Sequence, residues 1–382
     1  MMLFTLLSLV AASSWLPGLL CAPAPPYGEI VQHLQTEETT QSQETAQSHL
    51  KCDSLMPRRE WRSLEPEDRA AWISAVKCLA SQRYRRLSSH QSSNEYSPED
   101  RSLYDEFAYT HNKMHDTAHT IEYFLPWHRW FLNLFDKKLR ATCGYSGPTP
   151  YWDWTLDSAD PFHAPVFDGN PVTGLGSTGE CQLKDCHIVD GALAPSPGSQ
   201  FILAYPIPHP LRRNMTLYLY GDVTRPPLNE TFTPDRVQSI IETSPGDFYT
   251  FQEAIQHSHN SVHQLVGGDL NEQCPGSIPP ELCRVSYTTN DPIFWLHHAQ
   301  MDRLWSVWQR RHPANFRAFN GMPLNITWDD YMQLGDDIRK NTHNYDLHAS
   351  SDFMMNFDAM SKGVRVRDVF NHQIGELCYE YV

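Results

Sequence analysis

The chain has little positive charge and, beyond its first 20 residues, no long apolar run. Its 382 residues include 30 Lys and Arg against 45 Asp and Glu, which gives a formal net charge of -15. This excess of negative charge argues against nucleic acid or an anionic membrane surface as a partner. Because no later segment is apolar over the length that a bilayer requires, we also expect no transmembrane helix.

The N-terminal segment has a different composition from the rest of the chain. Residues 3–20 are apolar and uncharged and are followed by the small residues CAP. This pattern is typical of a secretory signal peptide, so we assign residues 1–22 to a signal and expect a secreted protein. Residues 23–50 are rich in Pro and then in Gln, Thr, Glu and Ser, which predicts a flexible leader or propeptide. The length allows about two domains, and we assign residues 51–382 to a single folded domain.

Nine cysteines are present, and Cys21 falls within the signal, which leaves eight in the exported chain. An even number of cysteines in a secreted protein indicates disulfides. Short separations favour Cys181 with Cys186 and Cys274 with Cys283, although the sequence does not choose among the many connectivities. Three N-glycosylation triplets fit the same compartment, at Asn214, Asn229 and Asn325.

Two histidines lie in strongly aromatic parts of the chain. His128 belongs to the stretch FLPWHRWFLNLF, and His298 belongs to NDPIFWLHHAQMDRLW. In each case a phenylalanine, Phe124 or Phe294, stands four residues earlier, where a helix would place it against the imidazole. Either histidine alone is equally well explained as a core histidine bonded to the backbone.

Each of these two histidines is preceded by three more. They are His111, His115 and His119 before His128, and His257, His259 and His263 before His298. A helix places His259 and His263 on one face, because they are four residues apart, as a two-ligand clamp for a metal. His257 points to the other side. Two such groups, each followed by a histidine with an aromatic wall, indicate metal binding.

The residues that these groups lack narrow the metal and its chemistry. They contain no cysteine, which a blue-copper electron-transfer site requires, whereas sites made of imidazole suit copper, zinc, iron or nickel. They also lack the glutamate of zinc proteases with the HExxH pattern, since Asn260 and Ser261 follow His259. A structural zinc site, which stabilises the fold and catalyses nothing, stays open as an alternative.

Helix signals place most of these histidines on helices. We predict helices over 65–79, from Ser97 and Pro98 through His111, from Pro126 through His128 to Leu139, over 248–266 ended by Gly267 and Gly268, and from Asp291 and Pro292 through Trp308. The segment 157–210 is rich in Gly, Pro and Asp and predicts a long loop region. The fold class is therefore mainly α, an antiparallel four-helix bundle that encloses a binuclear metal site, with long loops and minor β structure.

The same residues resemble a known family. The stretch from His119 to Arg129, which ends in FLPWHR, together with HNSVH and with DPIFWLHH followed by Asp302, resembles the two copper signatures of the tyrosinase, catechol oxidase and haemocyanin family. The opening REW and the run CGYSGPTPYWDW resemble short secreted fungal tyrosinase-like oxidases. This resemblance implies a type 3 site, in which two copper ions bind dioxygen and a phenolic substrate is oxidised to an o-quinone.

The resemblance also implies the roles of individual residues. One copper would be bound by His111, His119 and His128, and the other by His259, His263 and His298, with His115, His257 and His297 as neighbours. Phe124 and Phe294 would keep the pocket dry, Asp302 would orient the ligand rings unless it is an ordinary solvated charge, and Asn260, Gln264 and Val285 would border the substrate, unless Val285 is an ordinary buried loop residue. His111 is preferred to His115 as a ligand, although both residues can share a helical face.

Three departures from the family pattern bear on activity. Thr117 stands where many fungal relatives carry a cysteine joined to a histidine, so that crosslink is not expected. Asp136 replaces the glutamate that usually ends the first signature. Ile255 and Gln256 occupy the positions of the acidic residue thought to help deprotonate monophenols. We therefore expect oxidation of o-diphenols or o-aminophenols, with monophenols kept as a disfavoured substrate class.

The expected partners are a small phenolic substrate and dioxygen, and the sequence makes no prediction of oligomeric state. The Tyr-x-Tyr ending of the family appears as Tyr379 and Tyr381. A haemocyanin-like carrier that binds dioxygen without turnover would use the same copper site and is the alternative function.

Overall fold

The computed structural model describes residues 51–83, 101–119, 122–196, 201–273, 287–321 and 349–382. By contacts the chain divides into the units Met1–Lys51 and Cys52–Val382, and the structure below is that of the second unit. Several predictions lie outside the described residues, namely the signal, the leader, the helix start at Ser97 and Pro98, the pair Cys274 and Cys283, Val285 and Asn325.

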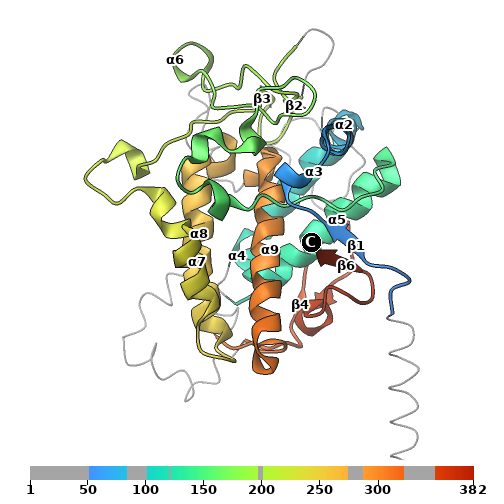
Figure 1. Ribbon diagram of the computed structural model, residues 1–382. Helices are drawn as coiled ribbons and strands as arrows, with labels where there is room; N and C mark the ends of the chain where they lie inside the picture. The colour runs from blue at the N-terminus through green and yellow to red at the C-terminus, as the bar shows by residue number, and fades with distance from the viewer. Residues whose placement is uncertain (1–50, 84–100, 120–121, 197–200, 274–286, 322–348) are drawn as a thin grey trace, which may run out of the picture. The chain divides into compact units, whose positions relative to one another are not determined.

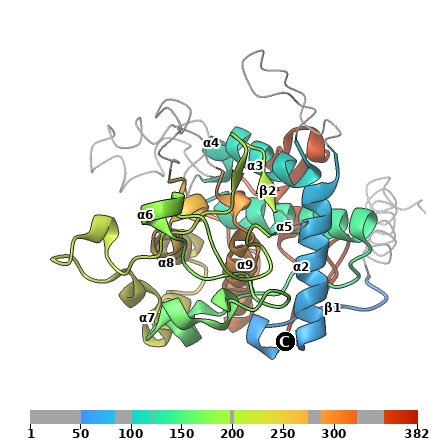
Figure 2. The same cartoon turned by 90° about the horizontal axis from the view of Figure 1, so that it is seen from above.

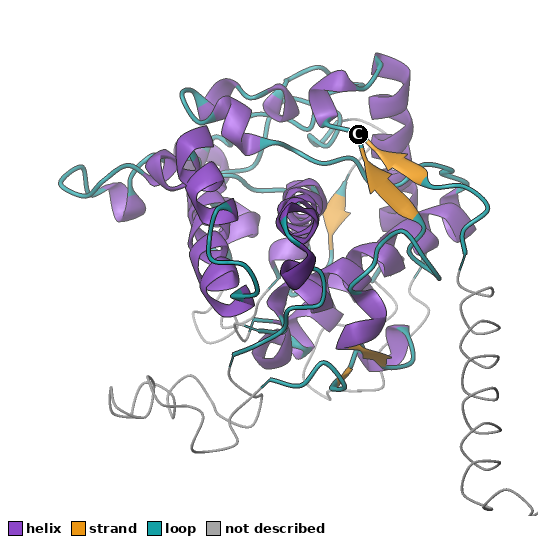
Figure 3. Ribbon diagram, turned by 60° about the horizontal axis from the view of Figure 1, so that its bottom comes forward, coloured by secondary structure: helices purple, strands orange, loops and turns teal. Residues whose placement is uncertain are grey.

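The described part of the chain is mainly helical, as predicted (Figures 1 and 3). Its α-helices are α2 (Pro66–Ser81), α3 (Leu103–Lys113), α4 (His115–Ala118), α5 (Phe124–Cys143), α6 (Cys181–Lys184), α7 (Pro234–Ile241), α8 (Phe248–Val266) and α9 (Ile293–Arg311). Its 3₁₀ helices are η1 (Trp61–Ser63), η3 (Trp154–Asp157), η4 (Pro161–His163), η5 (Pro165–Phe167), η6 (Leu219–Gly221), η7 (Leu228–Phe232), η8 (Gly268–Asn271), η10 (Thr288–Asn290), η11 (Pro313–Asn315), η13 (Asp358–Met360) and η14 (Val366–Val369). None of the described helices combines the length and the apolar character that crossing a membrane requires.

The described strands are short and occur in pairs. They are β1 (Met56–Arg58) parallel to β6 (Tyr379–Tyr381), β2 (Ile202–Leu203) antiparallel to β3 (His209–Pro210), and β4 (Met354–Met355) antiparallel to β5 (Val364–Arg365). The β1–β6 pair joins the first strand of the folded unit to its last. The predicted loop region, 157–210, contains α6, short 3₁₀ helices and the β2–β3 pair among its described residues.

Local signals explain where the histidine-bearing helices begin and end. The hydroxyl of Ser102 and the carboxylate of Asp105 form a capping box at the start of α3. The helix α8 has the predicted bounds, and Gly267 ends it with a positive φ of 66°. The helix α5 begins two residues before Pro126, so His128 lies in its second turn and not in its first. Proline is tolerated there because a first-turn N–H has no intrahelical partner.

Aromatic packing holds α3, α5, α8 and α9 together. Phe135 of α5 stacks on Trp295 of α9 with ring centroids 3.7 Å apart, and Phe107 of α3 meets both rings edge-on. Phe251 of α8 stacks on Trp308 of α9 at 4.7 Å. In Figure 1, α8 and α9 lie side by side and run in opposite directions, and they are again neighbours in the view of Figure 2. These contacts are of the kind that a helical bundle requires.

Disulfides and buried ion pairs fix the ends of these elements. Cys52 is bonded to Cys378, Cys78 to Cys143 and Cys181 to Cys186, of which the sequence favoured only the last. Asp136 pairs with Arg58 at 2.6 Å and accepts two hydrogen bonds from Thr149. Asp136 therefore joins α5 to β1 and to the segment before the aromatic run at residue 151, away from the histidines.

Candidate metal centre

The first histidine cluster, His111, His119 and His128, is assembled from three elements. His111 lies in the last turn of α3, His119 directly follows α4, and His128 lies in α5. One ring nitrogen from each lies within 4.8 Å of the others. The Nδ1 atoms of His119 and His128 lie 3.0 Å and 2.8 Å from the carbonyl oxygens of His115 and Phe124. These carbonyls accept hydrogen bonds, so the proton of each neutral ring is on Nδ1. Each Nε2 is therefore unprotonated and keeps a lone pair for a metal.

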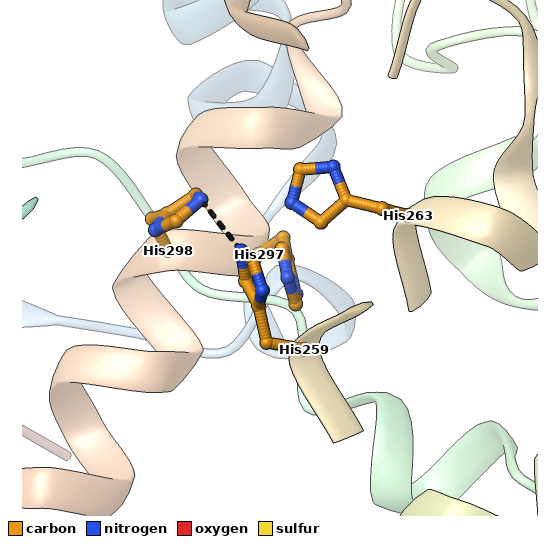
Figure 4. A group of neighbouring side chains, drawn as sticks. All are labelled: His259, His263, His297 and His298. Carbon is orange, nitrogen blue, oxygen red and sulfur yellow. Dashed lines mark hydrogen bonds between the residues drawn. The ribbon is translucent and has the colours of Figure 1, made fainter. Parts of the chain in front are cut away.

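The second cluster contains four buried histidines from two helices (Figure 4). They are His259 and His263 from α8, and His297 and His298 from α9. His263 donates from Nδ1 to the carbonyl of Leu270 at 2.6 Å, and its buried Nε2 has no hydrogen-bond partner. The Nε2 atoms of His259 and His298 face each other at 3.3 Å. A bound cation would satisfy these buried nitrogen atoms, so the donor set fits a metal.

The two clusters adjoin one another. The rings of His128 and His298 stack with their centroids 4.2 Å apart and an angle of 14° between their planes. Phe124 contacts both clusters, at 4.7 Å from His128 and 4.6 Å from His259. Phe294 does the same, at 4.1 Å from His298 and, edge-on, at 5.1 Å from His111. Two metal ions held here would therefore share one apolar, aromatic-walled pocket.

Burial keeps these imidazoles neutral. Loss of solvent lowers the pKa of His128 to about 3 and that of His263 to about 4. It also lowers the pKa values of His119, His259 and His298 well below the ordinary value, with neighbouring imidazoles adding to the effect. A neutral imidazole is the form that binds a metal, so at neutral pH no proton must first be displaced.

Of the three histidines that the sequence assigned as neighbours of the ligands, one belongs to the site and two do not. His297 is buried in the second cluster, where its Nδ1 accepts a hydrogen bond from Trp154 Nε1 at 3.1 Å and its ring stacks on His259. The sequence interpretation left it as a neighbour, and its only signal was its position beside His298 in an apolar helix. His115 and His257 are exposed and outside both clusters.

The predicted substrate residues that the structure describes lie on α8. Asn260 is exposed, and its Oδ1 lies 2.9 Å from Nδ1 of His259 and accepts a hydrogen bond from it. The proton of the His259 ring is therefore on Nδ1, and Nε2 keeps its lone pair. Gln264, one turn later, is partly exposed. Ile255 is buried and Glu253 is exposed. A carboxylate at position 253 therefore faces solvent.

Asp302 is neither a solvated charge nor, among the described contacts, a partner of a cluster histidine. Its carboxylate pairs with Arg129 and accepts hydrogen bonds from the hydroxyls of Tyr379 and Tyr381. Arg129 also donates to two carbonyls at the end of η14, those of Val369 and Phe370, and its guanidinium carbon lies 3.7 Å from the Trp305 ring centroid. Because Arg129 follows His128 directly, this ion pair connects the two ligand helices rather than orienting a ring.

Comparison with known proteins assigns the family. Residues 101–311 match the family model described as the common central domain of tyrosinase. The tyrosinase-like protein phomQ1 of Diaporthe leptostromiformis is 32% identical over 348 residues, which cover 86% of this chain and 78% of that protein. The N-acetyl-6-hydroxytryptophan oxidase ivoB of Emericella nidulans is 29% identical over 378 residues, covering 86% of this chain and 93% of that protein.

Solved structures agree with this assignment. A variant of the polyphenol oxidase from Thermothelomyces thermophila matches with a TM-score of 0.63 and 25% identity, over 91% of this chain and 94% of that one. The chain therefore belongs to the tyrosinase family. Within that family it is a type 3 copper oxidoreductase.

Proposed function

We propose that this chain is a secreted oxidase that binds two copper ions and uses dioxygen to convert o-diphenols or o-aminophenols to o-quinone-type products. The observation that carries the proposal is the contact between the two clusters through His128 and His298, whose ring centroids are 4.2 Å apart. His111, His119 and His128 would hold one ion, and His259, His263 and His298 the other. His297 would remain a neighbour, because its Nδ1 accepts a hydrogen bond from Trp154, so that a neutral ring carries its proton on Nε2 and has no lone pair left for a metal.

The residues of this chain would bind and orient the ions and keep the pocket dry. Bound copper would supply the exchange of electrons with dioxygen. The carbonyls of Phe124 and Leu270 fix which nitrogen of His128 and His263 carries the proton, and such outer partners typically change metal affinity by about 10- to 100-fold. The rings of Phe124 and Phe294 exclude water from the pocket between the ions. Three neutral imidazoles would hold each ion, and bound copper with this number of protein ligands would be able to accept dioxygen.

The choice of substrate rests on residues at the edge of α8. Asn260 and Gln264 have accessible side chains beside the second cluster and would border the substrate. No carboxylate faces the cluster from positions 255 and 256, which supports diphenols or aminophenols over monophenols. One relative is named for its action on a hydroxylated tryptophan derivative, which supports an aromatic hydroxyl compound as substrate.

Secretion is supported by features outside the site. Residues 1–22 have the pattern of a signal peptide. Three disulfides join six cysteines of the folded unit, and disulfides form in oxidising compartments. Asn214, in one of the glycosylation triplets, is exposed.

Metal analysis combined with oxygen uptake tests the proposal. Protein loaded with copper should hold about two ions per chain and consume dioxygen with catechol or 2-aminophenol faster than with phenol. His263→Ala protein is the control and should fold but lose turnover. Copper well short of two per chain, or no uptake on any phenol, would overturn the proposal.

The same experiment separates the two alternatives. Reversible oxygenation without quinone formation would indicate a haemocyanin-like carrier. Unfolding of His263→Ala, together with zinc binding that stabilises the wild type, would indicate a structural zinc site, because structural zinc contributes directly to folding free energy.

A further inference from the structure

A second group of buried charges lies just beyond the C-terminal end of α8. Asp269, in the 3₁₀ turn η8, is fully buried. Its Oδ1 lies 3.1 Å from Nε2 of His209, and its Oδ2 accepts a hydrogen bond from the backbone N–H of Arg212 at 2.8 Å. The guanidinium of Arg212 lies 3.8 Å from the same carboxylate. A carboxylate with no access to water is stable only because these groups surround it.

The ring of His209 is charged in this arrangement. Its Nδ1 lies 2.6 Å from the carbonyl oxygen of Ile207, and its Nε2 faces the Asp269 carboxylate. Both partners can only accept hydrogen bonds, so both ring nitrogens must donate, as in an imidazolium. Burial lowers the pKa of His209, but the charge of Asp269 and the hydrogen bonds to Asp269 and to the Ile207 carbonyl together outweigh it, and the net shift of the pKa is upward. His209 and Asp269 therefore form a buried ion pair of two charged, fully hydrogen-bonded groups.

This pair fastens the segment 209–216 along the end of α8. The backbone N–H groups of Asn214 and Thr216 donate to the carbonyls of Val266 and Leu265, which end a helix and lack intrahelical partners. Asp269 N–H donates in turn to the carbonyl of Arg212 at 3.0 Å. The backbones approach so closely that a side chain could not fit between them. A Cβ at Gly267 or Gly268 would lie 2.2 Å from a carbonyl oxygen of this segment.

The fastened turn also carries the partner of a metal ligand. Leu270 is the residue after Asp269, and its carbonyl accepts the Nδ1 proton of His263 at 2.6 Å. If η8 shifted, this carbonyl would move with it, and the proton of His263 could relocate to Nε2. Nε2 is the atom that must be unprotonated to bind a metal.

We propose that the ion pair of His209 and Asp269 positions the metal ligand His263, by holding η8 so that the Leu270 carbonyl fixes its tautomer and ring orientation. Neither residue touches the pocket, so both act as positioning residues for the second cluster. This inference rests on the proposed binding of metal by the two clusters. In the first cluster, the Nδ1 atoms of His119 and His128 are held by the carbonyls of His115 and Phe124 and not by η8, so we expect the affinity of that cluster to be independent of the pair.

Metal titration of single-cluster variants tests this inference. Asp269→Asn preserves the shape of the side chain but removes its charge and turns its NH2 group toward one of the two donors, Nε2–H of His209 or the backbone N–H of Arg212. In a His128→Ala background, which keeps only the second cluster intact, Asp269→Asn should weaken Cu(II) binding by about 10- to 100-fold. In a His263→Ala background, which keeps only the first cluster intact, the same change should leave Cu(II) affinity the same within about twofold, since outer partners act on the ligand they contact.

Asp136→Asn in the His128→Ala background is the matched control for lost stability. Asp136 is likewise a buried carboxylate with a cationic partner, Arg58, but its hydrogen bonds go to Arg58 and Thr149 and not to η8 or to a histidine of the second cluster. This variant should unfold more readily and bind Cu(II) as before. His209→Ala should weaken binding as Asp269→Asn does, and His209→Gln, whose amide N–H still reaches Asp269, should restore part of the loss.

The outcomes separate this inference from the proposed function. Wild-type protein that binds no Cu(II) at either cluster would overturn both. Wild-type protein that binds two ions, combined with unchanged affinity for Asp269→Asn and His209→Ala in the His128→Ala background, would overturn the positioning role alone. Equal losses for Asp269→Asn and Asp136→Asn would also overturn it, because they would show a general effect of stability.

Discussion

The two histidine clusters offer the same ligand atoms but are built differently. The second takes four buried histidines from two helices of 19 residues each, α8 and α9. The first takes its three from the end of α3, from the residue after the four-residue α4 and from α5, and His119 is only partly buried. Regular helices fix the geometry of the second cluster, whereas the first depends on a short irregular segment.

This difference has an energetic consequence for metal binding. Ligands on long packed helices are already ordered, so binding an ion there costs little conformational entropy. A ligand such as His119, which directly follows a four-residue helix and is only partly buried, is held less firmly and loses more conformational freedom when the ion binds. We therefore expect the second cluster to bind copper more tightly than the first, and to keep its geometry better when the protein is metal-free.

The largest expected effect follows from removing one ligand of either cluster. His128→Ala and His263→Ala should each reduce bound copper from about two ions to about one and abolish oxygen uptake, since three ligands hold each ion. The ion that remains in His128→Ala should resist a competing chelator better than the ion that remains in His263→Ala. Copper analysis during chelator titration measures this, and the reverse order would refute the comparison.

The next largest effect is a loss of folding stability, and it should disturb the helices of both clusters. Asp302→Ala leaves the guanidinium of Arg129 buried without its counter-charge, which typically costs about 3–5 kcal/mol. Arg129 follows His128, and Asp302 lies one turn after His298, so the change disturbs both ligand helices. Denaturant unfolding measures the loss, and Arg225→Ala is the control. Arg225 forms an exposed ion pair with Asp222 that contributes less than about 1 kcal/mol.

The sequence predicted the parts of the site that helical periodicity determines. The spacing of His259 and His263, the bounds of α8 and the aromatic neighbours of His128 and His298 all follow from local patterns. The choice between His111 and His115 did not, because a helix that breaks between them has no clear stop signal. The structure puts His111 in the first cluster and leaves His115 exposed.

Contacts between residues far apart in the chain could not be predicted from the sequence. The role of Asp302 depends on Arg129, 173 residues earlier, and on two tyrosines from the last strand. The bond between Cys52 and Cys378 spans 326 residues, and no spacing rule indicates it. His297 was assigned as a neighbour because the family resemblance implies His298 as the ligand. In the structure its Nδ1 accepts a hydrogen bond from Trp154, the first residue of η3, which lies 143 residues earlier in the chain.

A smaller effect is expected from acid on the metal-free protein. Folded His128 and His263 take up a proton only at a pKa of about 3 and about 4, whereas an unfolded histidine does so near about 6.5. Below pH of about 6.5 the unfolded chain binds more protons, so the free energy of unfolding should fall as the pH is lowered from about 7 to about 4. Unfolding midpoints measured across this range test the prediction. His263→Ala should show a shallower dependence, and an unchanged slope would contradict it.

The smallest effect should come from the histidine that the structure leaves outside the first cluster. His115 is exposed, its ring lies against that of His119 with centroids 4.5 Å apart, and its backbone carbonyl accepts a hydrogen bond from Nδ1 of His119. Since alanine keeps this carbonyl, His115→Ala should retain both copper ions and keep its turnover within about twofold, as surface substitutions generally do. His111→Ala, its partner in the test, should lose one ion. If His115→Ala lost copper and His111→Ala did not, the first cluster would have to be built from a different turn of the chain.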